Sequence, residues 1–353
     1  MALPFLSSQP KRLDQITAID LGARTTKAVY LQRKGSGLSF LGYALQDAPA
    51  YEKGLSPQLL GEHLGAIHQA LGGRSRQVVL ALGVGEALVR HAELPVVPVA
   101  DMRIMLKYNS KNYLQQDLPD HVFDCYIIPP RAGVKAEAPK AGQKCTVLVG
   151  GAKRQHIDDL QAAAKSAGLI PEQIVPSLIG PLNAFELAKP DVFNKDVIAL
   201  VDIGFKNSSI SILLHGELIL SRVVGIGGDR LTGGVAEALG VSYAEAEGIK
   251  VGLPDEVQAV MVTLLAPLGR ELRASIDFFE HQQDKPVTQV FVSGGSARSD
   301  YIIQILQTEL MVPCLNWNPA NFLTMALPPQ QMGEIEQISP QLTVAIGAAL
   351  AVM

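Results

Sequence analysis

The order of apolar and polar positions repeats at long range along the chain. Residues 16–31 (ITAIDLGARTTKAVYL) form an apolar run, an Asp-x-Gly turn with a short polar loop, and a second apolar run. Residues 197–212 (VIALVDIGFKNSSISI) have the same order. In both cases a further glycine turn leads into a third run. The pattern therefore predicts a three-stranded β-meander at the start of each half of the chain.

Strands and helices are predicted to alternate through the rest of both halves. Apolar runs that end in glycines predict strands at 76–85 and 288–297. Helical periodicity is present at 57–71, 155–167, 231–239, 243–251, 257–283 and 299–310. Because this alternation is duplicated, we expect two α/β domains that face each other.

Residues 87–171 lie between the two repeats and have a rhythm of their own. Strands are expected at 88–95, 121–130 and 144–153, the last two as partners, joined by the Ala, Gly, Lys and Pro-rich loop 131–143. A helix is expected at 101–116, with Asp101 as its N-cap. Its predicted inner face consists of Met102, Met105, Leu106, Asn109 and Tyr113. For the two methionines, core packing and an adaptable partner groove are equally good interpretations.

The two Asp-x-Gly turns carry the main chemical signal. Backbone amides of such turns point outward, and Gly22 and Gly204 would let a ligand approach closely. Two facing turns would clamp a polyphosphate. Asp20 and Asp202 would then repel the phosphates unless a divalent cation lay between them, which favours Mg²⁺. One Asp-x-Gly turn is ordinary hairpin chemistry, whereas two in matching contexts indicate a site.

Other candidates are weaker when each is taken alone. The glycine runs at 225–228 and 294–295 precede predicted helices, where they would hold a phosphate or simply form tight turns; neither is a GxxxxGK[ST] loop. Glu247 and Lys250 share a helix face, as a solvated ion pair would. His63 and His68 are spaced poorly for a metal and are expected to be solvated, and Trp317 is expected to pack.

Composition narrows the class of protein. The chain has 353 residues, 48% of them apolar, with 30 Lys and Arg against 34 Asp and Glu, a net charge of -4. General disorder is excluded, and nucleic-acid binding is not expected. The three cysteines are widely spaced, which argues against a disulfide framework or structural zinc and fits a reducing cytosol. The first residues do not match a signal peptide, and no direct membrane insertion is expected.

The order of these motifs resembles the actin/Hsp70/sugar-kinase ATPase superfamily and, within it, the PilM family of type IV pilus assembly proteins, which is related to FtsA. Residues 18–31 and 200–212 resemble the two phosphate motifs of that superfamily, and 290–299 its adenosine motif. The segments 175–188 and 343–352 resemble its connecting helices. The resemblance implies an α/β, actin-like (ribonuclease H-like), duplicated two-domain fold with a PilM/FtsA-type 1C subdomain insert.

The resemblance also implies a division of the chain. Domain 1A would begin with residues 1–86 and regain the connecting helix region 172–195, and the 1C-like subdomain would be 87–171. Domain 2 (2A/2B) would be 196–340, and the C-terminal connecting helix 341–353.

By resemblance, ATP and Mg²⁺ are the expected cofactors. Asp20 and Asp202 would hold Mg²⁺ through water, and Asp202 is the candidate catalytic residue. The residues expected around the nucleotide are Asp20, Gly22, Ala23, Arg24, Thr25, Thr26, Lys27, Gly204, Phe205, Lys206, Asn207, Ser208, Gly227, Gly228, Thr232, Glu247, Lys250, Gly294, Gly295 and Arg298.

The implied function is a cytoplasmic ATP-binding scaffold, held at the inner membrane through a partner, with slow or no hydrolysis. A PilN-like inner-membrane protein would place a short cytoplasmic peptide in or beside the 1C-like subdomain, and self-association stays open. Arg24 departs from the small hydroxyl residues usual in the family, and would either add a phosphate contact or fill the site. The segment 205–207 is bulkier than usual. The alternatives are an FtsA-like filament protein, a type II secretion relative and a small-molecule kinase.

Overall fold

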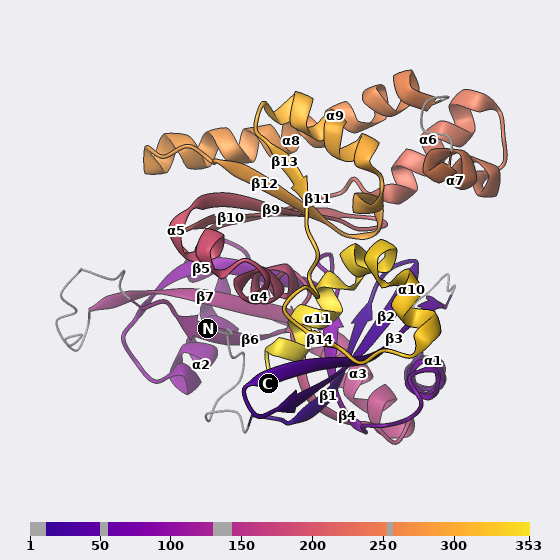
Figure 1. The fold of residues 1–353 in the computed structure, drawn as a ribbon. Helices are drawn as coiled ribbons and strands as arrows, with labels where there is room; N and C mark the ends of the chain where they lie inside the picture. The colour runs from indigo at the N-terminus through magenta and orange to yellow at the C-terminus, as the bar shows by residue number, and fades with distance from the viewer. Residues whose placement is uncertain (1–11, 50–55, 130–142, 253–256) are drawn as a thin grey trace.

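The protein has two lobes, each built on a twisted sheet, and a smaller third sheet beside them (Figure 1). The computed structural model describes residues 12–49, 56–129, 143–252 and 257–353. The predicted loop 131–143 lies outside these ranges apart from its last residue. None of the helices in the described ranges combines the length and the apolarity that crossing a bilayer requires.

The first lobe has a six-stranded sheet in the order β14-β3-β2-β1-β4-β8. Alternate residues of its strands enter two separate cores, as in Ala18 and Ile19 of β1. Helices α1 and α3 cover one face, and α11 contacts the other. The members of this lobe are β1 (Gln15–Leu21), β2 (Thr25–Lys34), β3 (Gly37–Asp47), β4 (Gln77–Leu82), β8 (Ile170–Pro176), β14 (Thr324–Met325), α1 (Pro57–Ala70), α3 (Arg154–Ser166), α10 (Pro329–Ile338), η3 (Ser339–Leu342) and α11 (Thr343–Leu350).

The second lobe repeats the opening of the first. Its sheet has the order β11-β10-β9-β12-β13, with an antiparallel meander followed by parallel strands. Asp202 is opposite Ser209 in this meander, and Asp20 is opposite Lys27 in the first one. The members are β9 (Val197–Ile203), β10 (Ser208–Leu214), β11 (Glu217–Val224), β12 (Gln289–Ser293), β13 (Cys314–Asn316), α6 (Gly228–Leu239), α7 (Tyr243–Gly252), α8 (Gln258–Gln283), η2 (Gly295–Arg298) and α9 (Asp300–Leu310). The predicted duplication is thus present in three dimensions.

The third sheet consists of β5 (Ala87–Pro95), β7 (Lys144–Lys153) and β6 (His121–Ile127), in that order, with helix α2 (Val99–Leu114) packed on it. We call these elements the small subdomain. The expected pairing of residues 121–130 with 144–153 is confirmed by the antiparallel β6–β7 ladder. Helix α3, which follows β7, packs on α1 of the first lobe instead.

Two details predicted for α2 are wrong. The helix begins at Val99 after Pro98, so Asp101 lies in its first turn and is not the N-cap. Its inner face also differs, because Asn109 has non-helical backbone angles (φ -136°, ψ 31°) that interrupt the helical phase. The buried positions are therefore Met102, Leu106, Ser110 and Leu114, so Met102 belongs to the core.

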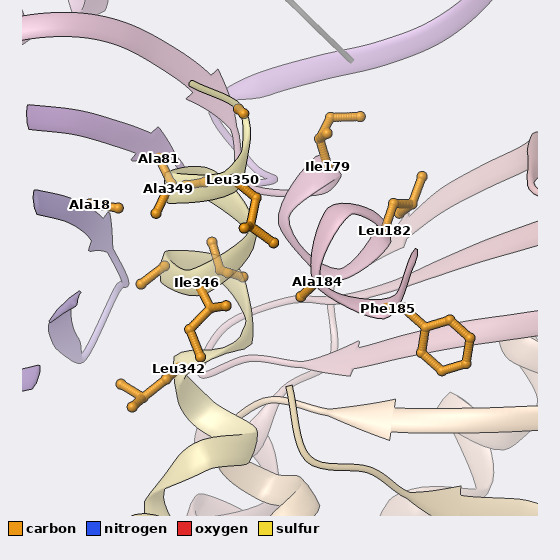
Figure 2. Packing of buried hydrophobic residues seen from close by; sticks show 14 of the residues in the cluster. Ala18, Ala81, Ile179, Leu182, Ala184, Phe185, Leu342, Ile346, Ala349 and Leu350 are labelled. Atoms are coloured by element: carbon orange, nitrogen blue, oxygen red, sulfur yellow. The ribbon is translucent and has the colours of Figure 1, made fainter. Parts of the chain in front are cut away.

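Two helices join the lobes. Helix α4 (Ile179–Ala188), followed by α5 (Pro190–Lys195), crosses α11, and apolar side chains of α4 and α11 enter one shared core (Figure 2). A Cβ on Gly347 would lie 1.8 Å from the carbonyl oxygen of Gly180. A Cβ on Gly180 would likewise lie 2.7 Å from Cα of Val344, so both crossing residues must be glycine for the helix backbones to touch. Trp317 packs edge-on against Phe185 at 5.0 Å in this core, as expected.

Candidate functional site

The two Asp-x-Gly turns line a single cleft between the lobes, with a volume of about 1640 Å³. The first turn joins β1 to β2, and the second joins β9 to β10. The sequence-based expectation that both turns face a shared cleft is therefore confirmed.

Steric constraints explain the glycine in each turn. A Cβ on Gly22 would lie 2.5 Å from the carbonyl oxygen of Thr25 and 2.7 Å from Nζ of Lys27. A Cβ on Gly204 would lie 2.8 Å from the carbonyl oxygen of Asn207, which also accepts a hydrogen bond from the Gly204 amide at 3.0 Å. Only glycine allows the backbone of each turn to pack this closely, and the missing side chain leaves the surface of the turn accessible to a ligand.

Three charged side chains lie at the floor of the cleft. The Lys27 ammonium donates to Asp20 Oδ2 at 2.9 Å, and Asp20 is buried. Asp202 Oδ1 accepts a hydrogen bond from Ser293 Oγ at 2.9 Å. Burial raises the pKa of Asp202, the Ser293 hydrogen bond and the Lys27 charge oppose this, and the Asp20 charge adds to it. The two carboxylates therefore lie close enough to influence each other, and they share one cation.

These carboxylates suit a Mg²⁺ ion. Mg²⁺ is usually held by one or two carboxylates together with waters and substrate phosphates. Asp20 and Asp202 place two carboxyl groups in the cleft, which is within the number of protein carboxylates that Mg²⁺ usually takes. The donor set thus fits the ion that the sequence predicts there.

A second polar cluster, on helices α6 and α7 of the second lobe, lies at the edge of the cleft. The Lys250 ammonium donates to Glu247 Oε2 and to Thr232 Oγ1, both at 2.7 Å. Burial of Glu247 favours a higher pKa, but hydrogen bonds from Lys250 and Thr232 outweigh it and hold the pKa below its ordinary value. Lys250 is buried, so the interpretation of this pair as a solvated surface contact is wrong.

The cleft collects most of the predicted site residues. Four of them lie behind its surface instead. Ser208 donates its hydroxyl proton to the Ile226 carbonyl at 2.6 Å, and Thr232 is fully buried. A Cβ on Gly227 would lie 2.4 Å from the Phe205 carbonyl oxygen. Gly294 has a φ of +94°, and a Cβ there would lie 2.5 Å from the Ile203 carbonyl oxygen. The predicted residues that do line the cleft are Asp20, Gly22, Ala23, Arg24, Thr25, Thr26, Lys27, Asp202, Gly204, Phe205, Lys206, Asn207, Gly228, Glu247, Lys250, Gly295 and Arg298.

The structure adds His63 to the site. Its Nε2 lies 2.8 Å from Thr26 Oγ1 near the start of β2, and burial lowers the pKa of the imidazole. His68, on the same helix, is buried. The expectation that both are solvated is therefore wrong for His68, whereas His63 is half-buried. No local signal marks His63, because its partner is 37 residues away in sequence. Glu86, His156 and Asp159 also line the cleft from other elements.

Comparisons with known proteins match this architecture. A family model described as type IV pilus assembly protein PilM matches residues 18–353. A solved structure described as the PilM-PilN type IV pilus biogenesis complex superimposes with a TM-score of 0.82 at 22% identity, covering 97% of this chain and 99% of that one.

Two more distant structures share the fold. The ethanolamine utilization protein EutJ of Carboxydothermus hydrogenoformans has a TM-score of 0.55 at 14% identity, covering 99% of this chain and 92% of its own. MreB5 of Spiroplasma citri bound to ADP has a TM-score of 0.53 at 11% sequence identity, and the match covers 94% of each chain. The fold is therefore the actin-like, two-domain α/β fold. From its match to the family model over residues 18–353, the chain belongs to the PilM family of type IV pilus assembly proteins.

Proposed function

We propose that this protein is a nucleotide-binding scaffold of a type IV pilus assembly complex. The observation that carries the proposal is the pair of Asp-x-Gly turns that line one cleft. Residues of both turns line the cleft, where Lys27, Arg24 and Lys206 supply positive charge for phosphates. MreB5, which shares the fold, was solved bound to ADP, which agrees with nucleotide binding by this fold.

In this proposal ATP lies across the cleft with its phosphates between the two turns. Asp20 and Asp202 would hold Mg²⁺ through water, and the ion would neutralise phosphate charge. Glu247 and Lys250 would contact the nucleoside from α7, and Gly295 and Arg298 from η2.

Hydrolysis is proposed to be slow or absent. Phe205 and Arg24 place bulky side chains at the phosphate turns, and Asp202 is already hydrogen-bonded to Ser293. A nucleotide would then act by selecting one arrangement of the lobes.

The small subdomain is proposed to hold a short apolar peptide from the cytoplasmic part of a PilN-like inner-membrane protein. Helix α2 supports this proposal, because Ile104 and Tyr108 are 55% and 71% exposed one turn apart. Lys107 Nζ lies 5.2 Å from the centre of the Tyr108 ring and adds positive charge to this face. The solved complex named PilM-PilN agrees with such a partner. Through it the protein would be cytoplasmic and peripheral to the inner membrane.

Calorimetric titration with ATP and Mg²⁺ tests the nucleotide site. The wild type is expected to bind in the micromolar range, on the order of -8 kcal/mol, and to release little phosphate. Gly22→Val should abolish binding, because its side chain would collide with Thr25 and Lys27. Gly37→Val is the matched control, since a Cβ there meets only ordinary contacts outside the cleft. Rapid phosphate release by the wild type would contradict the proposal of a scaffold with slow or absent hydrolysis. A wild type that does not bind ATP would contradict the proposed nucleotide site.

A peptide titration tests the partner site separately. The probe is a synthetic peptide with the cytoplasmic residues of the PilN-like protein from the same organism. Ile104→Asp with Tyr108→Asp should weaken binding, because charge would replace the apolar contact. Val262→Asp, at an exposed position on α8 of the second lobe, should leave it unchanged. Equal affinities for both variants would refute docking on α2.

A further inference from the structure

Arg24 reaches across the cleft from the first lobe to the second. Its Cζ lies 5.4 Å from the centre of the Phe205 ring, and its Nη1 lies 3.5 Å from Glu247 Oε2. Its own carbonyl accepts a hydrogen bond from the Ala48 amide at 2.8 Å, so the turn that carries it is fixed to the first lobe. The Arg24–Glu247 ion pair therefore connects the first lobe to the second.

This contact is easily exchanged. The side chains of Arg24 and Glu247 are 42% and 28% exposed, and partly solvated ion pairs at such distances are weak. Glu247 also has two closer partners, Lys250 and Thr232. Loss of Arg24 would therefore leave the Glu247 carboxylate neutralised and hydrogen-bonded. The arginine is the exchangeable partner, and Lys250 is the fixed one.

A polyphosphate would compete well for the guanidinium. Arginine presents its N–H groups as a planar fork that matches two phosphate oxygens, whereas Glu247 Oε2 already accepts a hydrogen bond from the Lys250 ammonium. Arg24 stands in the first phosphate turn and stacks on a residue of the second, so phosphates between the turns would lie within its reach.

We propose, on the basis of the nucleotide site above, that Arg24 exchanges Glu247 for the terminal phosphates of the bound nucleotide. Without a nucleotide, Arg24 would keep the contacts with Phe205 and Glu247 that link the lobes. A nucleotide with a full phosphate chain takes the guanidinium and breaks the link to Glu247. Arg24 thereby makes binding depend on phosphate number and couples it to the arrangement of the lobes.

Calorimetry with adenosine, ADP and ATP tests the phosphate dependence. Arg24→Ala should weaken ATP binding by roughly tenfold to a hundredfold relative to adenosine, because charge-assisted hydrogen bonds are lost. Arg24→Lys should give an intermediate loss, since it restores the charge without the fork. Arg222→Ala is the matched control, because its pair with Glu271 at 3.3 Å lies within the second lobe.

The outcomes separate the two proposals. If the wild type binds ATP but Arg24→Ala keeps its ratio of ATP to adenosine affinity, or raises it, the inference is overturned and the nucleotide site stands. If the wild type binds no nucleotide, both are overturned.

Energy transfer between fluorophores at positions 59 and 262 tests the link between the lobes. Both side chains are exposed, one on α1 and one on α8. ATP should change the distance in the wild type, and Arg24→Ala should shift or broaden the distance without nucleotide, whereas Arg222→Ala should not. An unchanged distance in nucleotide-free Arg24→Ala would refute the link.

Discussion

Lys27 Nζ lies 2.9 Å from Asp20 Oδ2 at the floor of the cleft, and the two residues are opposite each other in the β1–β2 ladder. The pair comes from one hairpin, so its geometry is set locally. Asp202, from the equivalent hairpin of the second lobe, is affected by both charges. The charge balance of the site therefore depends on the two lobes together.

Asp20→Asn should remove the Mg²⁺ dependence of ATP binding. In the wild type we expect Mg²⁺ to tighten binding by roughly tenfold or more, because the ion would connect the carboxylates to the phosphates. The variant should bind ATP almost equally with Mg²⁺ and with a chelator, as measured by calorimetry. Asp191→Asn, which alters an exposed pair with Lys195, is the control. A wild-type response to Mg²⁺ in Asp20→Asn would contradict this assignment.

Thr232→Val should destabilise the second lobe by about 1–2 kcal/mol, because it removes the hydroxyl that accepts a hydrogen bond from buried Lys250. The two side chains have nearly the same shape, so packing changes little. Urea unfolding measures the loss. Thr263→Val, whose hydroxyl is exposed on α8, is expected to lie within about 0.5 kcal/mol of the wild type. Equal effects of the two substitutions would show that the cluster adds no stability.

Gly347→Ala should destabilise the joint between the lobes by about 3 kcal/mol, because the new Cβ would collide with the Gly180 backbone. The atoms that the new Cβ would meet belong to the helix backbone, which cannot move aside as a flexible side chain can. Gly333→Ala is the control in α10, where a Cβ meets nothing within 4 Å, and it should stabilise the helix by about 0.5–1 kcal/mol. Thermal and urea unfolding measure both. A stable Gly347→Ala would contradict the backbone contact between α4 and α11.

Acid should destabilise the protein partly through His68. Burial, helped by the Arg76 charge, lowers the pKa of this imidazole in the folded state, and its buried Nδ1 has no hydrogen-bond partner. Below the unfolded pKa of about 6.5 the unfolded chain takes up a proton that the folded protein resists, so stability falls as pH falls. His68→Gln should therefore lose less stability than the wild type between pH 7.5 and 5.5 in urea unfolding. Parallel declines would exclude His68 as a source of the acid sensitivity.

Much of the site could be predicted from the sequence because its parts are local. An Asp-x-Gly turn between two apolar strands specifies a hairpin, and its repetition implies a second copy of the same hairpin. The helical periodicity of the sequence predicted the bounds of α1, α3 and α6 to α9 to within a few residues. The start of α2 was missed because the helix begins directly after Pro98, and its inner face was missed because the backbone break at Asn109 interrupts the helical period.

Contacts between distant segments could not be predicted in this way. His63 meets Thr26 because α1 lies along the sheet that contains β2, and nothing near either residue in the sequence indicates the other. The burial of Lys250 depends on how α7 packs against α6. Such contacts arise only when separate elements dock.

The sequence by itself determined the duplicated hairpins, their glycines and the acidic residue at the end of each first strand, since these follow from short-range sterics and alternation. Tertiary structure alone decided that Arg24 meets Phe205 and Glu247 across the cleft. That meeting depends on how the lobes sit against each other, and the close backbone contact between Gly180 and Gly347 is part of the packing that joins them. Local rules specify the two halves of the site, and packing at the joint brings them together.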